Sequence, residues 1–160
     1  MEKSLGKRGE LYVVIQFALA FLVIFGPRTL NGHPSWTEGT ISEISTIAGL
    51  IFLLFGGFLS VSGLFKLGHN LTPLPLPKEN STLVETGPYS LVRHPIYSGI
   101  IFCSFGWALL VHGYMTVIYS LIFFIFFDIK SRFEEKMLSK KFSDYPSYQK
   151  KVRKLIPFIY

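Results

Sequence analysis

The sequence predicts an all-α integral membrane protein with about four transmembrane helices, the last two forming a tight hairpin that leads into a cytoplasmic amphipathic helix. Composition is the first reason, because 49% of the 160 residues are hydrophobic and only 16% are charged, whereas soluble domains carry about 25% charged residues. The second reason is that the apolar residues gather in four runs. The third is that almost all bases lie on one side of the predicted spans.

The first two spans are predicted at about 9–26 and 44–67. The apolar stretch 11–25 contains one polar side chain, Gln16, and the second span contains no acid. A basic start before an apolar run is also typical of a signal peptide, but Gly26-Pro27-Arg28 is a poor cleavage site. We therefore interpret the first run as a span.

The third and fourth spans are predicted at about 95–111 and 114–130. Only His112-Gly113 separates their charge-free cores, which indicates a tight helical hairpin. A span needs roughly 20 apolar residues, so the shorter runs must include flanking residues or lie in thinned bilayer. Soluble core helices are the alternative, but four such runs with few amphipathic partners argue against it.

The bases predict the orientation. Of the 16 Lys and Arg residues, 15 precede the first span, lie between the second and third, or follow the fourth, and only Arg28 lies on the other side. By the positive-inside tendency, both termini are expected in the cytoplasm, and we expect a prokaryotic inner membrane. The net charge of +6 is thus mainly a topology signal. No nucleic-acid motif accompanies it, so no nucleic-acid partner is expected.

Without repeats or low-complexity tracts, residues 1–160 are predicted to form one membrane domain, with a cofactor loop at 68–95 and a cytoplasmic C-terminal segment at 131–160. Alternating prolines make the loop stiff and extended. Long irregular stretches in small domains are usually functional or disordered. Apolar residues continue after the fourth span at three- and four-residue spacing, so the helix is expected to run on as an amphipathic helix.

Small residues form a stripe on each of the second and third spans. Such stripes allow helix backbones to approach closely in lipid, and we interpret them as packing surfaces. The stripes consist of Gly49, Gly56, Ser60 and Gly63, and of Gly99, Cys103 and Gly106. Cys103 is the single cysteine, which excludes an intramolecular disulfide.

Two distant sets of polar and aromatic residues meet at the cytoplasmic end of the predicted helices. Pro95 suits the first turn of a helix, and a helix N-terminus favours an anion, while Tyr faces can hold a cation. A ligand with a carboxylate and a sulfonium suits this combination. The two sets are Tyr89, Arg93, His94 and Tyr97, and Lys130, Arg132, Glu134, Glu135, Tyr145 and Tyr148.

The same residues can instead be interpreted as membrane anchors and surface pairs that bind no ligand. Arg93 and His94 can extend to lipid head groups, and the tyrosines can form an interfacial aromatic belt. Lys130 and Glu134, four residues apart, can form a surface ion pair. Physical reasoning from the residues leaves both interpretations open.

Three stretches, LTPLPLP, STLVETGPYSLVRHPIYSG and FEEKMLSKKFSDYPSYQKKVRKLIP, together resemble the isoprenylcysteine carboxyl methyltransferase family and its phospholipid-methyltransferase relatives. The resemblance covers residues 68–157 in the family's order. It implies an integral membrane enzyme that transfers a methyl group from S-adenosylmethionine to a lipophilic acceptor, either an isoprenylcysteine-like carboxylate or a lipid.

The resemblance also implies site residues. Lys130 stands where a substrate-facing base is expected, and Arg132, two residues away, is the other candidate. Lys130 replaces an Arg, which weakens bidentate recognition of a carboxylate. Two further departures are Ser81, where the family usually has His or another polar residue, and Lys154, near which it has Arg. The expected cofactor-binding residues are Ser81, Thr82, Leu83, Val84, Tyr89, His94, Pro95, Ile96, Tyr97 and Glu134.

The expected reaction is an in-line displacement at the sulfonium methyl group. A carboxylate acceptor is ionised at pH 7 and needs no general base, so no catalytic residue is assigned beyond alignment and exclusion of water. A rival is an NADPH-dependent membrane sterol-type reductase, which carries a related His-Pro-x-Tyr element. A non-enzymatic membrane scaffold is another. No metal site is expected, because the four histidines lack ligand spacing.

The orientation can be tested by labelling single cysteines in a Cys103→Ser background. Cysteines at Ser35 and His112 should react with an impermeant reagent from outside, whereas those at Ser81 and Ser147 should react only after permeabilisation. External labelling at Ser81 would contradict the predicted topology, because the cofactor loop would face away from the cytoplasm.

Overall fold

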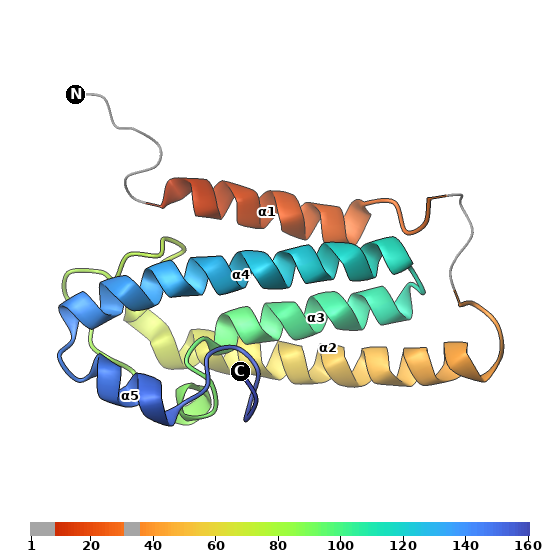
Figure 1. Ribbon diagram of the computed structural model, residues 1–160. Helices are drawn as coiled ribbons and strands as arrows, with labels where there is room; N and C mark the ends of the chain where they lie inside the picture. The colour runs from red at the N-terminus through yellow and green to blue at the C-terminus, as the bar shows by residue number, and fades with distance from the viewer. Residues whose placement is uncertain (1–8, 31–35) are drawn as a thin grey trace.

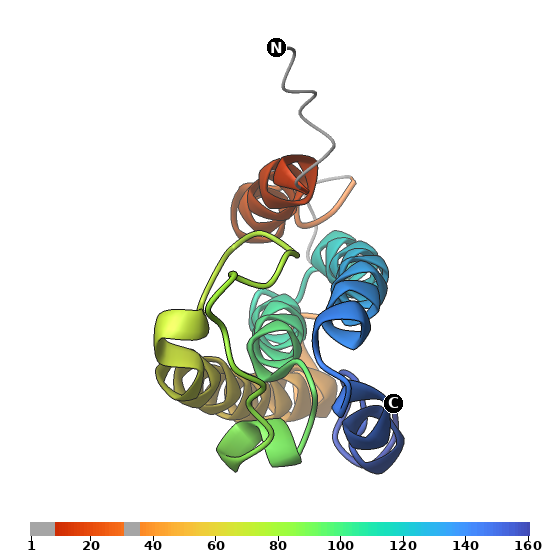
Figure 2. The same cartoon turned by 90° about the vertical axis from the view of Figure 1, so that its left-hand side faces the viewer.

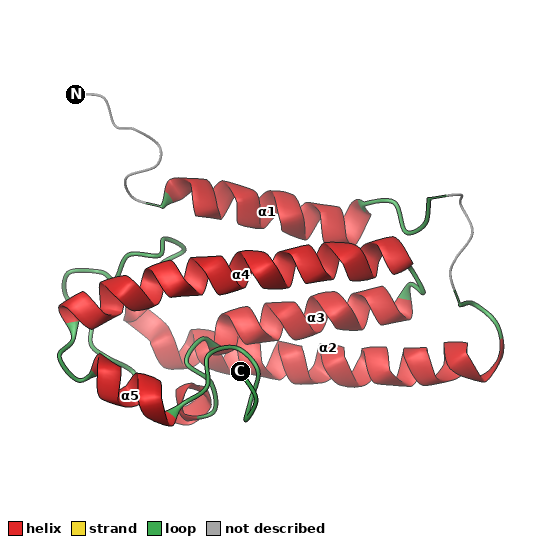
Figure 3. Cartoon of the chain, viewed as in Figure 1, coloured by secondary structure: helices red, strands yellow, loops and turns green. Residues whose placement is uncertain are grey.

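Every regular element in the described part of the chain is a helix. The computed structural model describes residues 9–30 and 36–160, so three of the predicted cytoplasmic bases (Lys3, Lys7 and Arg8) and Ser35 lie outside the described residues. The all-α fold class is confirmed, and only an isolated bridge between Val92 and Arg153 resembles strand pairing among the described residues. The helices are α1 (Glu10–Phe25), α2 (Gly39–Leu67), α3 (Pro95–Leu110), α4 (Tyr114–Lys141) and α5 (Tyr145–Lys151), with short 3-10 turns η1 (Gly68–Asn70) and η2 (Gly87–Ser90) (Figure 3).

Helix boundaries follow local sequence signals. Pro95 occupies the first turn of α3, where its missing N–H costs nothing. α2 ends before Gly68, whose φ of 52° favours glycine. α2 begins at Gly39, earlier than expected, while α4 runs without a break to Lys141. The apolar stretch and its amphipathic continuation are therefore one helix.

The four long helices lie alongside one another, and the end-on view places α3 between α2 and α4 (Figures 1 and 2). α2 packs along α3, α3 contacts α4, and α1 packs mainly against α4. The loop from 71 to 94 and α5 lie together at one end of this bundle (Figure 1). Leu155, in the segment after α5, belongs to the same buried cluster as Phe123 and Phe127 of α4. This packing holds the C-terminal segment against the bundle.

The outer surface of the bundle is apolar. Two described helices, Gly39–Asn70 and α4, are long and apolar enough to cross a membrane, with mean hydropathies of 2.2 and 1.5 in their most apolar windows. α1 and α3 are apolar but shorter. Leu54 and Phe65 on α2 are 75% and 82% exposed, and Phe17 on α1 is 66% exposed. Such a surface suits lipid rather than water.

Glycines bring α2 and α3 into backbone contact, which confirms the packing role of the small-residue stripes. A Cβ added at Gly49 would lie 2.8 Å from the carbonyl oxygen of Gly106, and one at Gly56 would lie 2.6 Å from that of Gly99. The Cys103 thiol packs at the same contact and donates to the Leu53 carbonyl at 3.7 Å. In lipid, where apolar burial adds little specificity, such close backbone packing drives helix association.

Two neighbouring glycines offer a matched test of this contact. Gly56→Ala should lower the free energy of unfolding by about 1 to 3 kcal/mol, because its Cβ has no space against α3. Gly57→Ala should leave stability unchanged or raise it by up to about 1 kcal/mol, because its Cβ would meet nothing within 4 Å and Ala favours helix. Unfolding in detergent with increasing denaturant measures both. Equal losses would show that the contact between α2 and α3 is not tight at Gly56.

Candidate functional site

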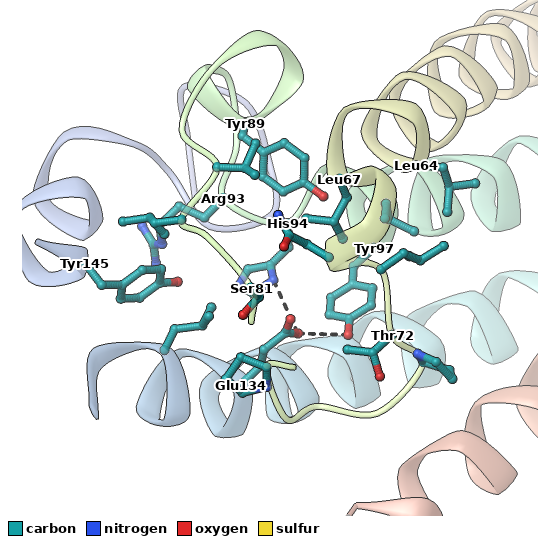
Figure 4. Close-up of a pocket in the computed structure, with 18 of the residues that line it drawn as sticks. Leu64, Leu67, Thr72, Ser81, Tyr89, Arg93, His94, Tyr97, Glu134 and Tyr145 are labelled. Atoms are coloured by element: carbon teal, nitrogen blue, oxygen red, sulfur yellow. Dashed lines mark hydrogen bonds and ion pairs between the residues drawn. The ribbon is translucent and has the colours of Figure 1, made fainter. Parts of the chain in front are cut away.

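A cavity of about 290 Å³ lies at the end of the bundle where the loop and α5 meet the helices (Figure 4). This volume is close to the lower limit of small-molecule pockets. Of the predicted site residues, Pro95 and Arg132 do not line the cavity. Those that line it are Ser81, Thr82, Leu83, Val84, Tyr89, His94, Ile96, Tyr97, Lys130 and Glu134.

The loop over the cavity is held by side-chain hydrogen bonds. The amide of Asn70 pairs with the backbone of Thr82, accepting from its N–H at 3.2 Å and donating to its carbonyl at 3.3 Å. From α4, the ammonium of Lys141 donates to the Glu79 carbonyl and the Ser81 hydroxyl, each at 2.7 Å. These contacts place the stretch that begins at Ser81 on the cavity wall.

Glu135 on α4 is the meeting point of three segments beside the cavity. Its Oε1 accepts from Arg93 Nε at 2.7 Å and lies 3.1 Å from His94 Nε2, while its Oε2 accepts from Gln149 on α5 at 2.9 Å. The side chains of Arg93, His94 and Glu135 are 10%, 5% and 9% exposed. Arg93 also donates to the carbonyls of Gln149 and Val152. The interpretation of Arg93 and His94 as head-group anchors is therefore wrong, because both are buried in this network.

Glu134 points in a different direction from its neighbour, as expected from the 100° step between adjacent helix residues. Its Oε2 accepts from the Tyr97 hydroxyl at 2.9 Å and lies 3.7 Å from His94 Nδ1, and Glu134 lines the cavity whereas Glu135 does not (Figure 4). The Tyr97 ring is stacked between His94 and Phe127, with centroid distances of 5.4 and 4.7 Å. The stack fixes the aromatic wall of the cavity.

Lys130 is a buried cation whose partners are neutral. It is 1% exposed, and its Nζ donates to Gln16 Oε1 on α1 at 2.5 Å and to the Pro73 carbonyl at 3.3 Å. Its Nζ also lies 5.0 Å from the centroid of the Tyr97 ring. It forms no ion pair with any described residue, so the interpretation as a surface pair with Glu134 is wrong.

Arg132 lies away from the cavity. Its side chain is 67% exposed and pairs with Asp128, one turn earlier on α4, at 2.9 Å. Asp128 also accepts hydrogen bonds from Lys154 and from the Tyr160 hydroxyl. These contacts attach the C-terminal segment to α4, so Arg132 belongs to a surface cluster that fastens this segment.

Several lining residues were not among the predicted site residues. Gln16 stands out in the sequence only as the one polar side chain of its apolar run. Tyr145 and Tyr148 on α5 belong to the two sets of polar and aromatic residues described above but have no predicted contact, and both line the cavity.

Burial raises the pKa of both phenols and of Tyr89 above the usual value, so all three stay protonated near neutral pH. Tyr89 and Tyr148 donate to the carbonyls of Gly63 and Tyr89, respectively.

The profile of the phospholipid methyltransferase family matches residues 44–145. The protein-S-isoprenylcysteine O-methyltransferase of Saccharomyces cerevisiae is 33% identical over 122 residues, which are 74% of this chain and 51% of the yeast protein. That of Schizosaccharomyces pombe is 32% identical over 130 residues, 79% of this chain and 55% of the relative. The chain therefore spans about half the length of these curated relatives.

The fold has a solved counterpart. The structure of the eukaryotic intramembrane Ras methyltransferase ICMT (isoprenylcysteine carboxyl methyltransferase) superimposes with a TM-score of 0.65 and 24% identity, covering 99% of this chain and 55% of that one. The likeness concerns the arrangement of the helices.

The two adjacent carboxylates should respond differently to removal of charge. Glu135→Gln should lower the free energy of unfolding by about 3 kcal/mol, because Arg93 would remain buried without its counter-ion. Glu134→Gln should change it by less than about 1 kcal/mol, because its side chain is 25% exposed and an amide oxygen can still accept from Tyr97. Chemical unfolding without added ligand measures both variants. A larger loss for Glu134→Gln would contradict the network described here.

Proposed function

Because this chain belongs to the phospholipid methyltransferase family, we propose that it transfers a methyl group from S-adenosylmethionine to a lipophilic acceptor at the cytoplasmic face of a membrane. The acceptor is an isoprenylcysteine-like carboxylate or a lipid. The two yeast relatives are named protein-S-isoprenylcysteine O-methyltransferase, and the similar solved structure is named isoprenylcysteine carboxyl methyltransferase, which favours the carboxylate.

The observation that carries the proposal is that one cavity combines two kinds of wall. Leu64 and Leu67 of α2 and Ile100 of α3 contribute apolar side chains to the lining, whereas Ser81 and Glu134 contribute polar groups. Figure 4 draws Leu64 and Glu134 at different edges of the cavity. A transferase that joins a water-soluble donor to a lipid-soluble acceptor needs both kinds of surface in contact.

The polar side has the chemistry to hold the methyl donor. The carboxylate of Glu134 can accept hydrogen bonds from ribose hydroxyls or an amino group, and the Tyr97 face can interact with a sulfonium. The stretch from Ser81 to Val84 and Tyr89 contribute further wall, and Pro95 acts through the start of α3 that it favours. When bound, the donor supplies an electrophilic methyl group.

Lys130, rather than Arg132, is the base proposed to hold the acceptor. A nearly fully buried ammonium that forms no contact ion pair is costly unless an anion binds nearby. The charge of Glu134 acts on Lys130 only from beyond contact distance, and Lys130 lines the cavity. The hydrogen bonds to Gln16 and Pro73 fix its position. An acceptor carboxylate is ionised at pH 7 and needs no general base. The contribution of these residues to the rate is alignment of the reactants and exclusion of water beneath the loop and α5.

The placement in the membrane belongs to the same proposal. α1 to α4 cross the bilayer as four spans, and residues 1–160 form one domain. α3 and α4 form a hairpin around residues 111–113. Both termini lie in the cytoplasm of a prokaryotic cell. Residues 131–160 then lie on the cytoplasmic side. This orientation is supported by the position of the cavity, since its end of the bundle also carries the predicted cytoplasmic bases of the loop, α4 and α5.

Ligand binding by the purified protein tests the function. S-adenosylmethionine should bind and NADPH should not, and labelled methyl should pass from the donor to N-acetyl-S-farnesylcysteine. Glu134→Gln should weaken donor binding roughly 10- to 100-fold, because a charge-assisted hydrogen bond contributes about 1.5 to 3 kcal/mol. Titration calorimetry gives both affinities. Binding of NADPH instead would favour the reductase alternative, and binding of neither ligand would favour a scaffold.

A further inference from the structure

Tyr145 presents a buried hydroxyl that nothing in the described chain satisfies. The residue is the first of α5, is 1% exposed and lines the cavity. Its Oη is the only buried side-chain nitrogen or oxygen atom among the described residues that has no hydrogen-bond partner. Figure 4 shows the ring at the edge of the cavity, with the oxygen turned toward the group of drawn residues.

The other tyrosines of the cavity use their hydroxyls inside the protein. Tyr97 donates to Glu134 at 2.9 Å, Tyr89 donates to the Gly63 carbonyl at 3.4 Å, and Tyr148 donates to the Tyr89 carbonyl at 2.5 Å. Since buried polar groups in folded proteins are nearly always paired, an exception calls for a physical reason. A phenylalanine would fill the same space without the desolvation cost of the hydroxyl. The partner of Tyr145 is therefore expected to arrive with a ligand.

The position of Tyr145 is set before any ligand binds. Its backbone N–H donates to the Phe142 carbonyl at 3.2 Å, and Pro146 follows it in the first turn of α5. Its ring packs edge-on against Tyr148, with a centroid distance of 5.8 Å. A side chain fixed in this way loses little conformational entropy when it makes a new contact.

Electrostatics decide what kind of group the hydroxyl can meet. Burial and the nearby charge of Glu135 raise the pKa of the Tyr145 phenol, so it remains an O–H donor at neutral pH. Arg93, Glu134 and Tyr148 are its other charged or titratable neighbours. Figure 4 places Tyr145 beside Arg93, away from Leu64 and Thr72 at the opposite side. Tyr145 therefore borders the polar groups of the cavity rather than the part suited to a lipid chain.

We infer that Tyr145 is a further contact of the methyl donor, donating a hydrogen bond from its phenol to an oxygen or ring nitrogen of that molecule. The inference rests on the proposed function, because it assigns the donor to the polar side of the cavity. It adds α5 to the elements that bind the donor. The same helix is held by Arg93 and Glu135 through Gln149, so the network beside the cavity also positions this contact.

Two conservative variants on α5 test the inference. Tyr145→Phe should weaken binding of S-adenosylmethionine about three- to tenfold, the loss typical of one hydrogen bond. Its unfolding midpoint without ligand should equal or exceed that of the unmodified protein, because no internal hydrogen bond is lost. The matched control, Tyr148→Phe, should lower the midpoint, because it leaves the buried Tyr89 carbonyl without this donor.

Three probes locate the contact and separate the possible outcomes. Titrations use S-adenosylmethionine, S-adenosylhomocysteine and 5′-methylthioadenosine, which lacks the amino-acid portion. Weaker binding of all three by Tyr145→Phe supports a contact with the nucleoside, and weaker binding of only the first two supports a contact with the amino-acid portion. Unchanged affinity for all three overturns the inference, as does a midpoint lowered as far as in Tyr148→Phe. If the unmodified protein binds none of the probes, the proposed function itself fails.

Discussion

The candidate site depends on the hydrogen bonds that the buried carboxylate of Glu135 accepts. A carboxylate removed from water destabilises a fold unless donors surround it, and this one is satisfied by Arg93, His94 and Gln149. Arg93 and His94 belong to the loop that leads into α3, and Gln149 belongs to α5. Because one anion needs all of them, the loop and α5 must close on α4 together. The cavity wall is thus a consequence of satisfying this charge.

The helix bundle determines what each side of the cavity offers. The glycine contact between α2 and α3 is tight enough to bring the end of α2 beside the start of α3, which places Leu64 and Leu67 on the cavity. α1 adds a single polar group there, Gln16, which holds the Lys130 ammonium. The cavity therefore combines polar groups from the loop, α1 and α4 with apolar side chains from the ends of α2 and α3. This juxtaposition suits a reaction between a water-soluble donor and a lipid-soluble acceptor.

Much of the candidate site could be predicted because the chemistry-bearing residues lie in short motifs. His94 and Tyr97 flank the proline that begins α3, and the different directions of Glu134 and Glu135 follow from helix geometry alone. Spacing could not show that Arg93 pairs with Glu135, because an arginine near a span suits a lipid head group equally well. Nor could it reveal Gln16 as a partner of Lys130, since a lone polar residue in an apolar run has no characteristic pattern.

Whether the sequence alone or only the tertiary structure determines a feature depends on how far apart in the chain the interacting residues lie. The sequence by itself determined the helical class, the apolar outer surfaces, the start of α3 at Pro95 and the small-residue stripes, because these depend on composition and on a period of 3.6 residues. Only the tertiary structure decided which polar groups meet. Gln16 and Lys130 are 114 residues apart, and His94 and Glu135 are 41 apart. Such pairings depend on how whole helices pack, and that packing also buries the Tyr145 hydroxyl and places Lys130, rather than Arg132, in the cavity.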